Sequence, residues 1–145
     1  MPNEPEAGTA GTGAGSTPAR PRIEVTAAVV ERDGAFLLTR RLDGTHLEGY
    51  WEFPGGKRHG GESLRECLVR EIREELDAEV AVGDKMLATS HDYPERTVDL
   101  HFFRCTLLTE PRPVLGQEMR WVRREELAAY PLPPADDELV KLLTA

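Results

Sequence analysis

The feature that most constrains this chain is a helix whose apolar side ends in carboxylates. Ser63 is a suitable N-cap, and Glu66 three residues later completes a capping box, so we predict a helix from Ser63 to about Leu76. The residues that define its buried side recur at helical spacing and are Leu64, Cys67, Leu68 and Ile72.

Three glutamates follow on that same side of the predicted helix. At about 100° per residue, Glu71 and Glu75 fall within roughly 20° of Leu64, and Glu74 lies at the border of the face. Like charges at i and i+4 repel each other, and burying an unpaired ionised carboxylate is costly. A cation is therefore needed to compensate the charges of these glutamates where the helix packs against the rest of the protein.

Two sources of positive charge are open. The arginines of the helix, Arg65, Arg70 and Arg73, would pair the acids if this were a solvated charged face. A divalent ion is the alternative, because ligands that are all oxygens select a hard cation such as Mg²⁺ or Mn²⁺. We favour the ion, because the acids lie on the apolar side. A glycine-rich loop, 55–61, also precedes the helix and lets backbone carbonyls approach a metal.

Such a site suits hydrolysis of a phosphate anhydride. The ion polarises a phosphoryl oxygen, lowers the pKa of a bound water and bridges to phosphate oxygens. The chain has a net charge of −8, which argues against a nucleic acid polymer or an anionic membrane as partner. The expected partner is a small-molecule nucleotide.

The chain of 145 residues suits one domain of mixed α+β class. Residues 1–21 are rich in Gly, Ala, Pro, Thr and Ser and predict a disordered tail, which leaves 22–145 as the domain. We expect turns at Asp33-Gly34, Pro54-Gly55-Gly56 and Pro94-Glu95-Arg96. The pattern predicts strands over 23–30, 35–40, 50–53, 78–82, 85–89, 97–107 and 119–122, and further helices over 124–129 and 135–143.

The sequence does not indicate a thiol redox site, a zinc site or a membrane protein. Cys67 and Cys105 form no CxxC pair and are predicted to be free buried thiols. The four histidines lack the spacing of a zinc site. No apolar run approaches the ~20 residues of a membrane span, and the N-terminus lacks a signal-peptide pattern, so we expect a cytoplasmic protein.

The charged residues of the loop and helix also follow a known order. Gly56, five residues, Glu62, seven residues and then Arg70-Glu71-Ile72-Arg73-Glu74-Glu75 resemble the Nudix box. The likeness runs from about residue 23 to 143. Segments 51–57 and 130–136 are similar to those of MutT-type nucleoside triphosphate pyrophosphohydrolases. The resemblance implies the Nudix fold, a mixed β-sheet sandwiched between helices as an α/β/α sandwich.

The resemblance also implies roles for the box. Glu71, Glu74 and Glu75 would be metal ligands together with the Gly55 carbonyl, and Arg70 would orient the acids. Glu62 would support them. Water would attack phosphorus and release a nucleoside monophosphate and pyrophosphate, with Mg²⁺ or Mn²⁺ as cofactor.

Two positions depart from the family pattern. Asp77 stands where the box normally has glycine, just after the helix, and aspartate tolerates a left-handed conformation better than most residues. The family often places a further glutamate before a late Gly-Gln pair, but Leu115 stands there. Glu118 is the nearest substitute. The general base is left open between Glu71, Glu118 and a water activated by the metal alone.

Apart from Lys57, the candidate substrate contacts lie outside the box. Arginines and one lysine are candidates for the phosphates, and two aromatic residues could flank a base. These residues are Arg40, Arg41, Lys57 and Arg96, of which Arg41 and Arg96 lie nearest the substrate by resemblance, and Phe53 and Tyr93.

Asp136 is the candidate for reading the base. MutT-type enzymes carry asparagine there, whereas an ionised aspartate only accepts hydrogen bonds. Guanine and 8-oxoguanine offer two neighbouring donors, so we hypothesise that the substrate is an oxidised deoxynucleoside triphosphate such as 8-oxo-dGTP. The same segment also resembles cytidine triphosphate pyrophosphohydrolases, which is the close alternative.

Two further functions are compatible with the pattern. One is hydrolysis of a sugar nucleotide such as ADP-ribose. The other is a non-catalytic nucleotide-binding module, which the complete set of box carboxylates disfavours. A monomer and a homodimer are equally compatible with the sequence.

Overall fold

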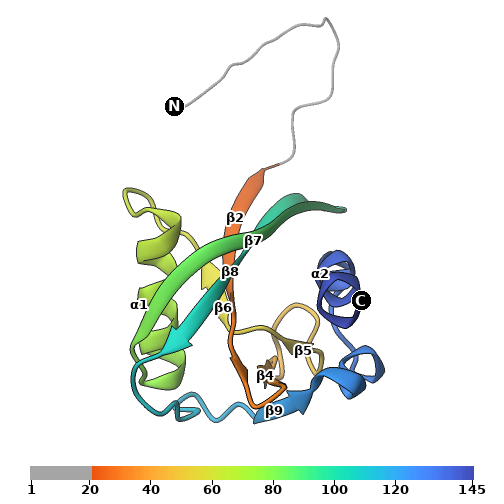
Figure 1. The fold of residues 1–145 in the computed structure, drawn as a ribbon. Helices are drawn as coiled ribbons and strands as arrows, with labels where there is room; N and C mark the ends of the chain where they lie inside the picture. Colours follow the sequence, from red (N-terminus) through yellow and green to blue (C-terminus); the bar gives the residue numbers. More distant parts are fainter. Residues whose placement is uncertain (1–20) are drawn as a thin grey trace, which may run out of the picture.

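The computed structural model describes residues 21–145 (Figure 1). The predicted tail, apart from Pro21, lies outside the described residues. The carbonyl of Pro21 already accepts a hydrogen bond from the N–H of Thr97, at 2.9 Å. Within residues 21–145, no helix has the length and apolar character needed to cross a membrane.

The first sheet has the strand order β6-β2-β8-β7. It is mixed, because β2 pairs with β8 in parallel while β6 pairs with β2 and β7 pairs with β8 in antiparallel fashion. The bounds are β2 Arg22–Val29, β6 Gly55–Lys57, β7 Val80–Tyr93 and β8 Arg96–Leu107.

The second sheet is antiparallel and is built around β4, which pairs with β3, β5 and β9. A turn at Asp33 and Gly34, both with positive φ, joins β3 to β4 as predicted. The bounds are β3 Glu31–Arg32, β4 Ala35–Arg40, β5 Trp51–Glu52 and β9 Met119–Arg123.

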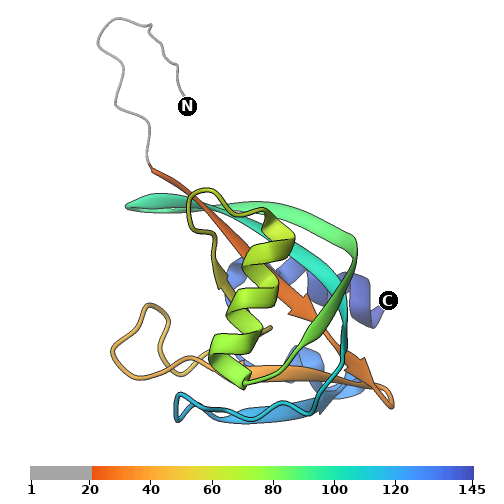
Figure 2. The same cartoon turned by 90° about the vertical axis from the view of Figure 1, so that its left-hand side faces the viewer.

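Helices lie on both sides of the strands (Figures 1 and 2). Strand β2 shows why, since its side chains alternate between two core clusters. Ala27 and Val29 belong to a cluster with Leu139 of α2 (Asp137–Thr144), and Ala28 belongs to a cluster with Leu68 of α1 (Leu64–Leu76). The expected α+β fold, with strands between helices, is confirmed.

Strand β7 differs from the expectation of two short strands over 78–82 and 85–89. It is one 14-residue strand with register shifts between Val82 and Lys85 and between Lys85 and Leu87. A Cβ on Gly83 would lie 2.9 Å from the carbonyl oxygen of Arg104, so glycine permits close pairing at the irregularity. The strand continues to Tyr93, and the turn expected at Pro94-Glu95-Arg96 follows it, at Pro94 and Glu95.

The expected turn at Pro54-Gly55-Gly56 is also wrong in part. Gly55 and Gly56 belong to β6, in register with Ala27 and Thr26 of β2. A Cβ on Gly55 would overlap the carbonyl oxygen of Thr26. Glycine is therefore required here for close approach of two strands rather than for a reversal of the chain.

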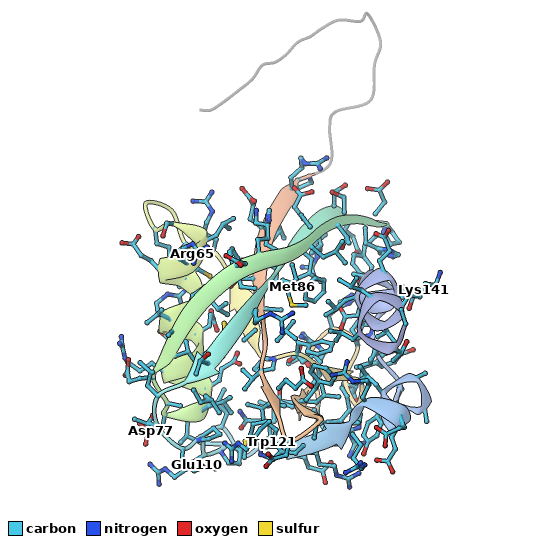
Figure 3. The ribbon with its side chains drawn as sticks, viewed as in Figure 1. Arg65, Asp77, Met86, Glu110, Trp121 and Lys141 are labelled. Atoms are coloured by element: carbon cyan, nitrogen blue, oxygen red, sulfur yellow. The ribbon has the colours of Figure 1, made fainter. Side chains whose placement is uncertain are left out.

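The C-terminal helices are tighter than expected. Residues Arg124–Ala129 form a 3₁₀ helix, and the segment predicted as helix 135–143 begins as a 3₁₀ turn, Pro134–Asp136, before α2. None of the three has a side-chain hydrogen bond at its N-cap. Figure 3 shows Lys141 pointing outward from α2, which marks the solvent side of that helix.

Both ends of α1 are closed by hydrogen bonds. The capping box is confirmed, with Glu66 N–H donating to Ser63 Oγ at 3.0 Å and Ser63 N–H donating to Glu66 Oε1 at 2.8 Å. At the other end Asp77, labelled in Figure 3, has φ 50° and ψ 42°, the left-handed conformation expected for this position. Asp77 also pairs with Arg112 of the loop between β8 and β9.

Candidate active site

One cavity of about 390 Å³ opens between the first sheet, α1 and the residues before α2. It collects most of the predicted site residues, although they come from segments far apart in the chain. Those that line it are Arg41, Phe53, Gly55, Lys57, Glu71, Glu75, Tyr93, Arg96 and Asp136. Arg70, Glu74 and Glu118 do not line it.

The acidic end of the cavity is formed by Glu71 and Glu75 of α1. The Glu71 side chain is only 12% exposed, and its carboxylate packs so closely on Gly56 that a Cβ there would overlap it. Burial, and then the charges of Glu71 and Glu52, raise the pKa of Glu75 to about 9. The hydrogen bond between Glu71 and Glu75 needs a proton on one of them.

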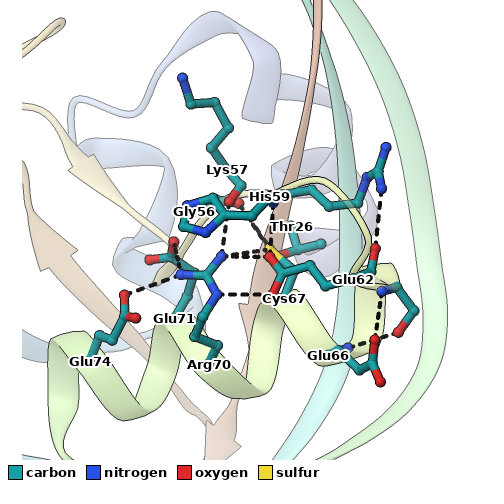
Figure 4. A network of polar contacts seen from close by, with 12 residues as sticks. Thr26, Gly56, Lys57, His59, Glu62, Glu66, Cys67, Arg70, Glu71 and Glu74 are labelled. Atoms are coloured by element: carbon teal, nitrogen blue, oxygen red, sulfur yellow. Dashed lines mark hydrogen bonds and ion pairs between the residues drawn. The ribbon is translucent and has the colours of Figure 1, made fainter. Parts of the chain in front are cut away.

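Arg70 organises the outer side of these acids (Figure 4). It donates to Glu62 at 2.6 and 3.0 Å, to Glu71 at 3.0 Å, to Glu74 at 3.1 Å and to the carbonyl of Lys57 at 3.1 Å. Hydrogen bonds from Arg70 and from the His59 backbone lower the pKa of Glu62 to about 2. Pairing with Arg70 therefore compensates the negative charges of the two outer acids, Glu62 and Glu74.

The other two arginines of the helix serve different partners. Arg73 pairs with Glu79 at 2.7 Å, and Arg65 donates to the carbonyl of Val82 at 2.9 Å. Glu74 is 56% exposed and turned toward Arg70, so it does not converge with Glu71 and Glu75. Across residues 21–145, no three His, Cys, Asp or Glu side chains form a ready-made metal cluster.

Glu52 also lines the cavity, although the sequence did not indicate it as a site residue. Trp51 and Phe53 are both buried in the core, so the alternation of β5 turns Glu52 to the other face, and this pattern is the signal that could have revealed it. Its carboxylate accepts from Arg41 Nη1 at 2.8 Å. Burial raises the pKa of Glu52, and the nearby Arg41 opposes that rise.

The residues present fit a hard divalent cation. The candidate donors at the acidic end are all oxygens: the carboxylates of Glu71 and Glu75 and the carbonyl of Gly55. The absence of a Cβ on Gly56 makes room for the Glu71 carboxylate. A cation here would take the place of the proton that the two glutamates otherwise share.

The opposite end of the cavity contains Asp136, which is only 4% exposed. Burial first, and then the charges of Glu52 and Asp137, raise its pKa to about 7. Phe53 lies nearby but is also a core residue, 3% exposed and packed edge-to-face on Phe102 with ring centroids 6.1 Å apart.

The loop between β8 and β9 does not place Glu118 where a catalytic carboxylate was expected. That side chain is 53% exposed and pairs with Arg40 at 3.1 Å, away from the cavity. The buried residue of the loop is Gln117, whose Nε2 donates to the carbonyl of Glu75 at 3.0 Å. The loop therefore supports the end of α1 and does not place a carboxylate in the cavity.

Cys67 and Cys105 are free and buried, as predicted. Burial raises the pKa of both thiols, to about 12 for Cys105, so neither is a ready thiolate. Thiol chemistry therefore plays no part in the candidate site.

A family model described as NUDIX domain matches residues 25–142, which include both ends of the cavity. The chain belongs to the NUDIX domain family. The loop and helix that carry Gly56, Arg70 and Glu71 are thus the Nudix box expected from the sequence, and the chain is a Nudix hydrolase.

Similar proteins agree on the class of reaction. The chain is 40% identical to a CTP pyrophosphohydrolase of Escherichia coli, over 85% of this chain and 92% of that protein. It is 32% identical to an 8-oxo-dGTP diphosphatase of Haemophilus influenzae, over 83% and 90% of the two chains. The crystal structure of a MutT protein from Methanosarcina mazei superposes with a TM-score of 0.78 at 26% identity, covering 88% and 96%.

Proposed function

We propose that this Nudix hydrolase is a Mg²⁺-dependent pyrophosphohydrolase that converts nucleoside triphosphates to monophosphates and pyrophosphate. The proposal rests on one cavity that is lined by largely buried carboxylates of α1, by cationic side chains and by the buried Asp136 just before α2. These groups suit the metal-bound phosphates, the other phosphates and the base of a nucleotide.

In this proposal Glu71 and Glu75, with the Gly55 carbonyl, hold the ion. When bound, Mg²⁺ supplies charge stabilisation at a phosphoryl oxygen and lowers the pKa of a bound water. Arg70 fixes Glu71 through a 3.0 Å hydrogen bond and joins Glu74 to the same network. Since Glu118 pairs with Arg40 outside the cavity, Glu71 is the better candidate for the general base.

The cations of the cavity wall offset the acidic surroundings. Arg41, Lys57 and Arg96 line the cavity, and we assign them to the phosphates. Arg41 is oriented by Glu52 and by the carbonyl of His46, to which its Nε donates. A guanidinium has five N–H donors, so most remain available for a phosphate.

The base preference depends on the protonation of Asp136. The preference for guanine assumed an ionised carboxylate, but a pKa of about 7 leaves a large neutral fraction at neutral pH. A neutral carboxyl both donates and accepts, which matches N3 and the amine of cytosine. Guanine can pair with either form. We therefore propose CTP-type substrates first, in accord with the name of the 40% identical relative, and 8-oxo-dGTP second.

The protonation of Asp136 makes a testable prediction. As pH rises from about 6 to about 8, Asp136 loses its proton, and the donor to cytosine N3 is lost. We expect kcat/KM for CTP relative to 8-oxo-dGTP to fall about tenfold over that range. In Asp136→Asn, whose amide does not titrate, the ratio should stay constant. The measurement is pyrophosphate release at each pH with both substrates.

The same assay separates the competing functions. A ratio that favours 8-oxo-dGTP at every pH would defeat the cytidine preference. Release of AMP and ribose 5-phosphate from ADP-ribose, with no triphosphate turnover, would point to a sugar-nucleotide hydrolase. Tight nucleotide binding without turnover in Mg²⁺ would indicate a binding module.

A further inference from the structure

The last turn of α1 carries Glu75 and ends against the loop between β8 and β9 (Figures 1 and 2). A helix leaves the carbonyls of its last turn without partners inside the helix, so other groups have to supply the donors. The backbone of the loop supplies two of them. Arg112 N–H donates to the carbonyl of Leu76 at 2.7 Å, and Val114 N–H donates to the carbonyl of Glu75 at 3.2 Å. The loop is thus attached to the backbone of the turn that carries Glu75.

One side chain of the loop adds a third hydrogen bond to this turn. Gln117 Nε2 donates to the same Glu75 carbonyl at 3.0 Å, while Gln117 Oε1 accepts from the N–H of Leu115 at 2.9 Å. Gln117 is only 8% exposed, and each end of its amide faces a backbone group of one kind, so the orientation of the amide is determined. Gly116, with φ 84°, permits the turn between these two loop residues. Gln117 therefore ties the loop both to itself and to the helix.

The space behind the Glu75 side chain is not filled by packing. A second, smaller cavity of about 150 Å³ lies on the loop side, and its lining includes Glu75, Glu52, Leu115 and Gln117. Glu75 and Glu52 line the main cavity as well, so these two carboxylates separate the two cavities. Because neighbouring side chains leave this space open, the position of the Glu75 carboxylate depends on how firmly its backbone is held.

We propose that Gln117 is a positioning residue, whose hydrogen bond holds the last turn of α1 in the geometry in which Glu75 reaches the cation together with Glu71. The inference rests on the proposed function, since that function assigns both glutamates to a divalent ion. Glu71 lies one turn earlier and is held separately by Arg70, at 3.0 Å. Loosening of the last turn would therefore move one metal ligand relative to the other. Residues that orient metal ligands in this way typically contribute about tenfold to a hundredfold in metal affinity.

Loss of the Gln117 amide is expected to weaken metal binding without changing substrate recognition. Gln117→Met has a side chain of similar length but no donor, so its Kd for Mn²⁺ and its Mg²⁺ concentration for half-maximal activity should both rise about tenfold. Saturating Mg²⁺ should restore most of kcat, and KM for CTP should then stay within about twofold of wild type. The measurements are calorimetric titration with Mn²⁺ and pyrophosphate release over a range of Mg²⁺ concentrations.

Thr109→Val is the matched control for this substitution. Thr109 belongs to the same loop, and its Oγ1 accepts from the N–H of Glu79 at 2.9 Å, so the variant loses a comparable bond to the backbone after α1 but none at Glu75. It should bind Mn²⁺ as wild type does, even if its unfolding temperature decreases.

A milder variant covers the case in which Gln117→Met does not fold. Gln117→Asn keeps the amide on a shorter side chain, which no longer reaches the Glu75 carbonyl, and its Mn²⁺ affinity should also fall. Wild-type Mn²⁺ affinity in a folded Gln117 variant, or an equal loss in Thr109→Val, would overturn the inference.

Metal binding measured without turnover separates this inference from the proposed function. Mn²⁺ that binds Gln117→Met about tenfold more weakly than wild type, without turnover of any triphosphate by either protein, would support the positioning role and reject the pyrophosphohydrolase. Turnover of CTP with equal Mn²⁺ affinity and equal Mg²⁺ dependence in both proteins would do the reverse.

Discussion

Replacing Glu71 with glutamine is expected to lower kcat for triphosphate hydrolysis about a thousandfold, because the change removes one of two carboxylates that hold the cation. The amide is close in shape to the carboxylate and its oxygen can still accept from Arg70, so the fold should persist. The metal-free protein should be about as stable as wild type, because the glutamine amide can donate a hydrogen bond to Glu75 in place of the shared proton.

A loss of activity combined with retained stability distinguishes a functional carboxylate from a structural one. The measurements are steady-state pyrophosphate release and thermal unfolding without metal. Glu126→Gln is the control, because Glu126 is exposed on the 3₁₀ helix Arg124–Ala129 far along the chain from the box. If Glu71→Gln kept wild-type kcat, the assignment of the acidic end would be wrong.

Gly56→Ala is expected to reduce kcat/KM about a hundredfold without unfolding the protein. The new Cβ would overlap the Glu71 carboxylate, which is the far end of a flexible side chain and can swing aside. The carboxylate would then leave the position that faces Glu75. The expected signature is a higher Mg²⁺ concentration for half-maximal activity, with only a small decrease in the unfolding temperature.

Gly60→Ala supplies a matched control for that substitution. Gly60 belongs to the same loop, and a Cβ there would meet no described atom within 4 Å. Its activity should remain within about twofold of wild type. Equal activity of Gly56→Ala and Gly60→Ala would show that close packing of Glu71 on Gly56 has no functional role.

Local signals predicted the parts of the site that lie within one element. The capping box at Ser63, the helix to Leu76 and the carboxylates on its apolar side depend on residues a few positions apart, and they appear as expected. The left-handed conformation of Asp77 follows from the same local reasoning.

Tertiary contacts decided the features that the sequence reasoning missed. Gly55 was interpreted as part of a turn, and two strands were expected on either side of residues 83–84, but Gly55 and Gly83 each allow close approach to a strand that is distant in sequence. The contact of His46 with Tyr93 joins a loop to a strand 47 positions further on, and neither segment predicts it alone.

We expect a divalent cation to replace the proton that Glu71 and Glu75 share in the metal-free protein. The pKa of Glu75 is about 9 in the folded state against 4.5 for an ordinary glutamate. This difference determines whether the stability of the protein rises or falls with pH. Between these values the folded state holds a proton that the unfolded state releases. The stability of the metal-free protein should therefore fall as pH rises through this window.

The decisive measurement is thermal unfolding with and without Mg²⁺ at about pH 6 and about pH 8.5. We expect Mg²⁺ to raise the unfolding temperature by several degrees at the higher pH, by less at the lower pH, and by almost nothing in Glu71→Gln. No effect of Mg²⁺ at the higher pH, or an equal effect in Glu71→Gln, would contradict it.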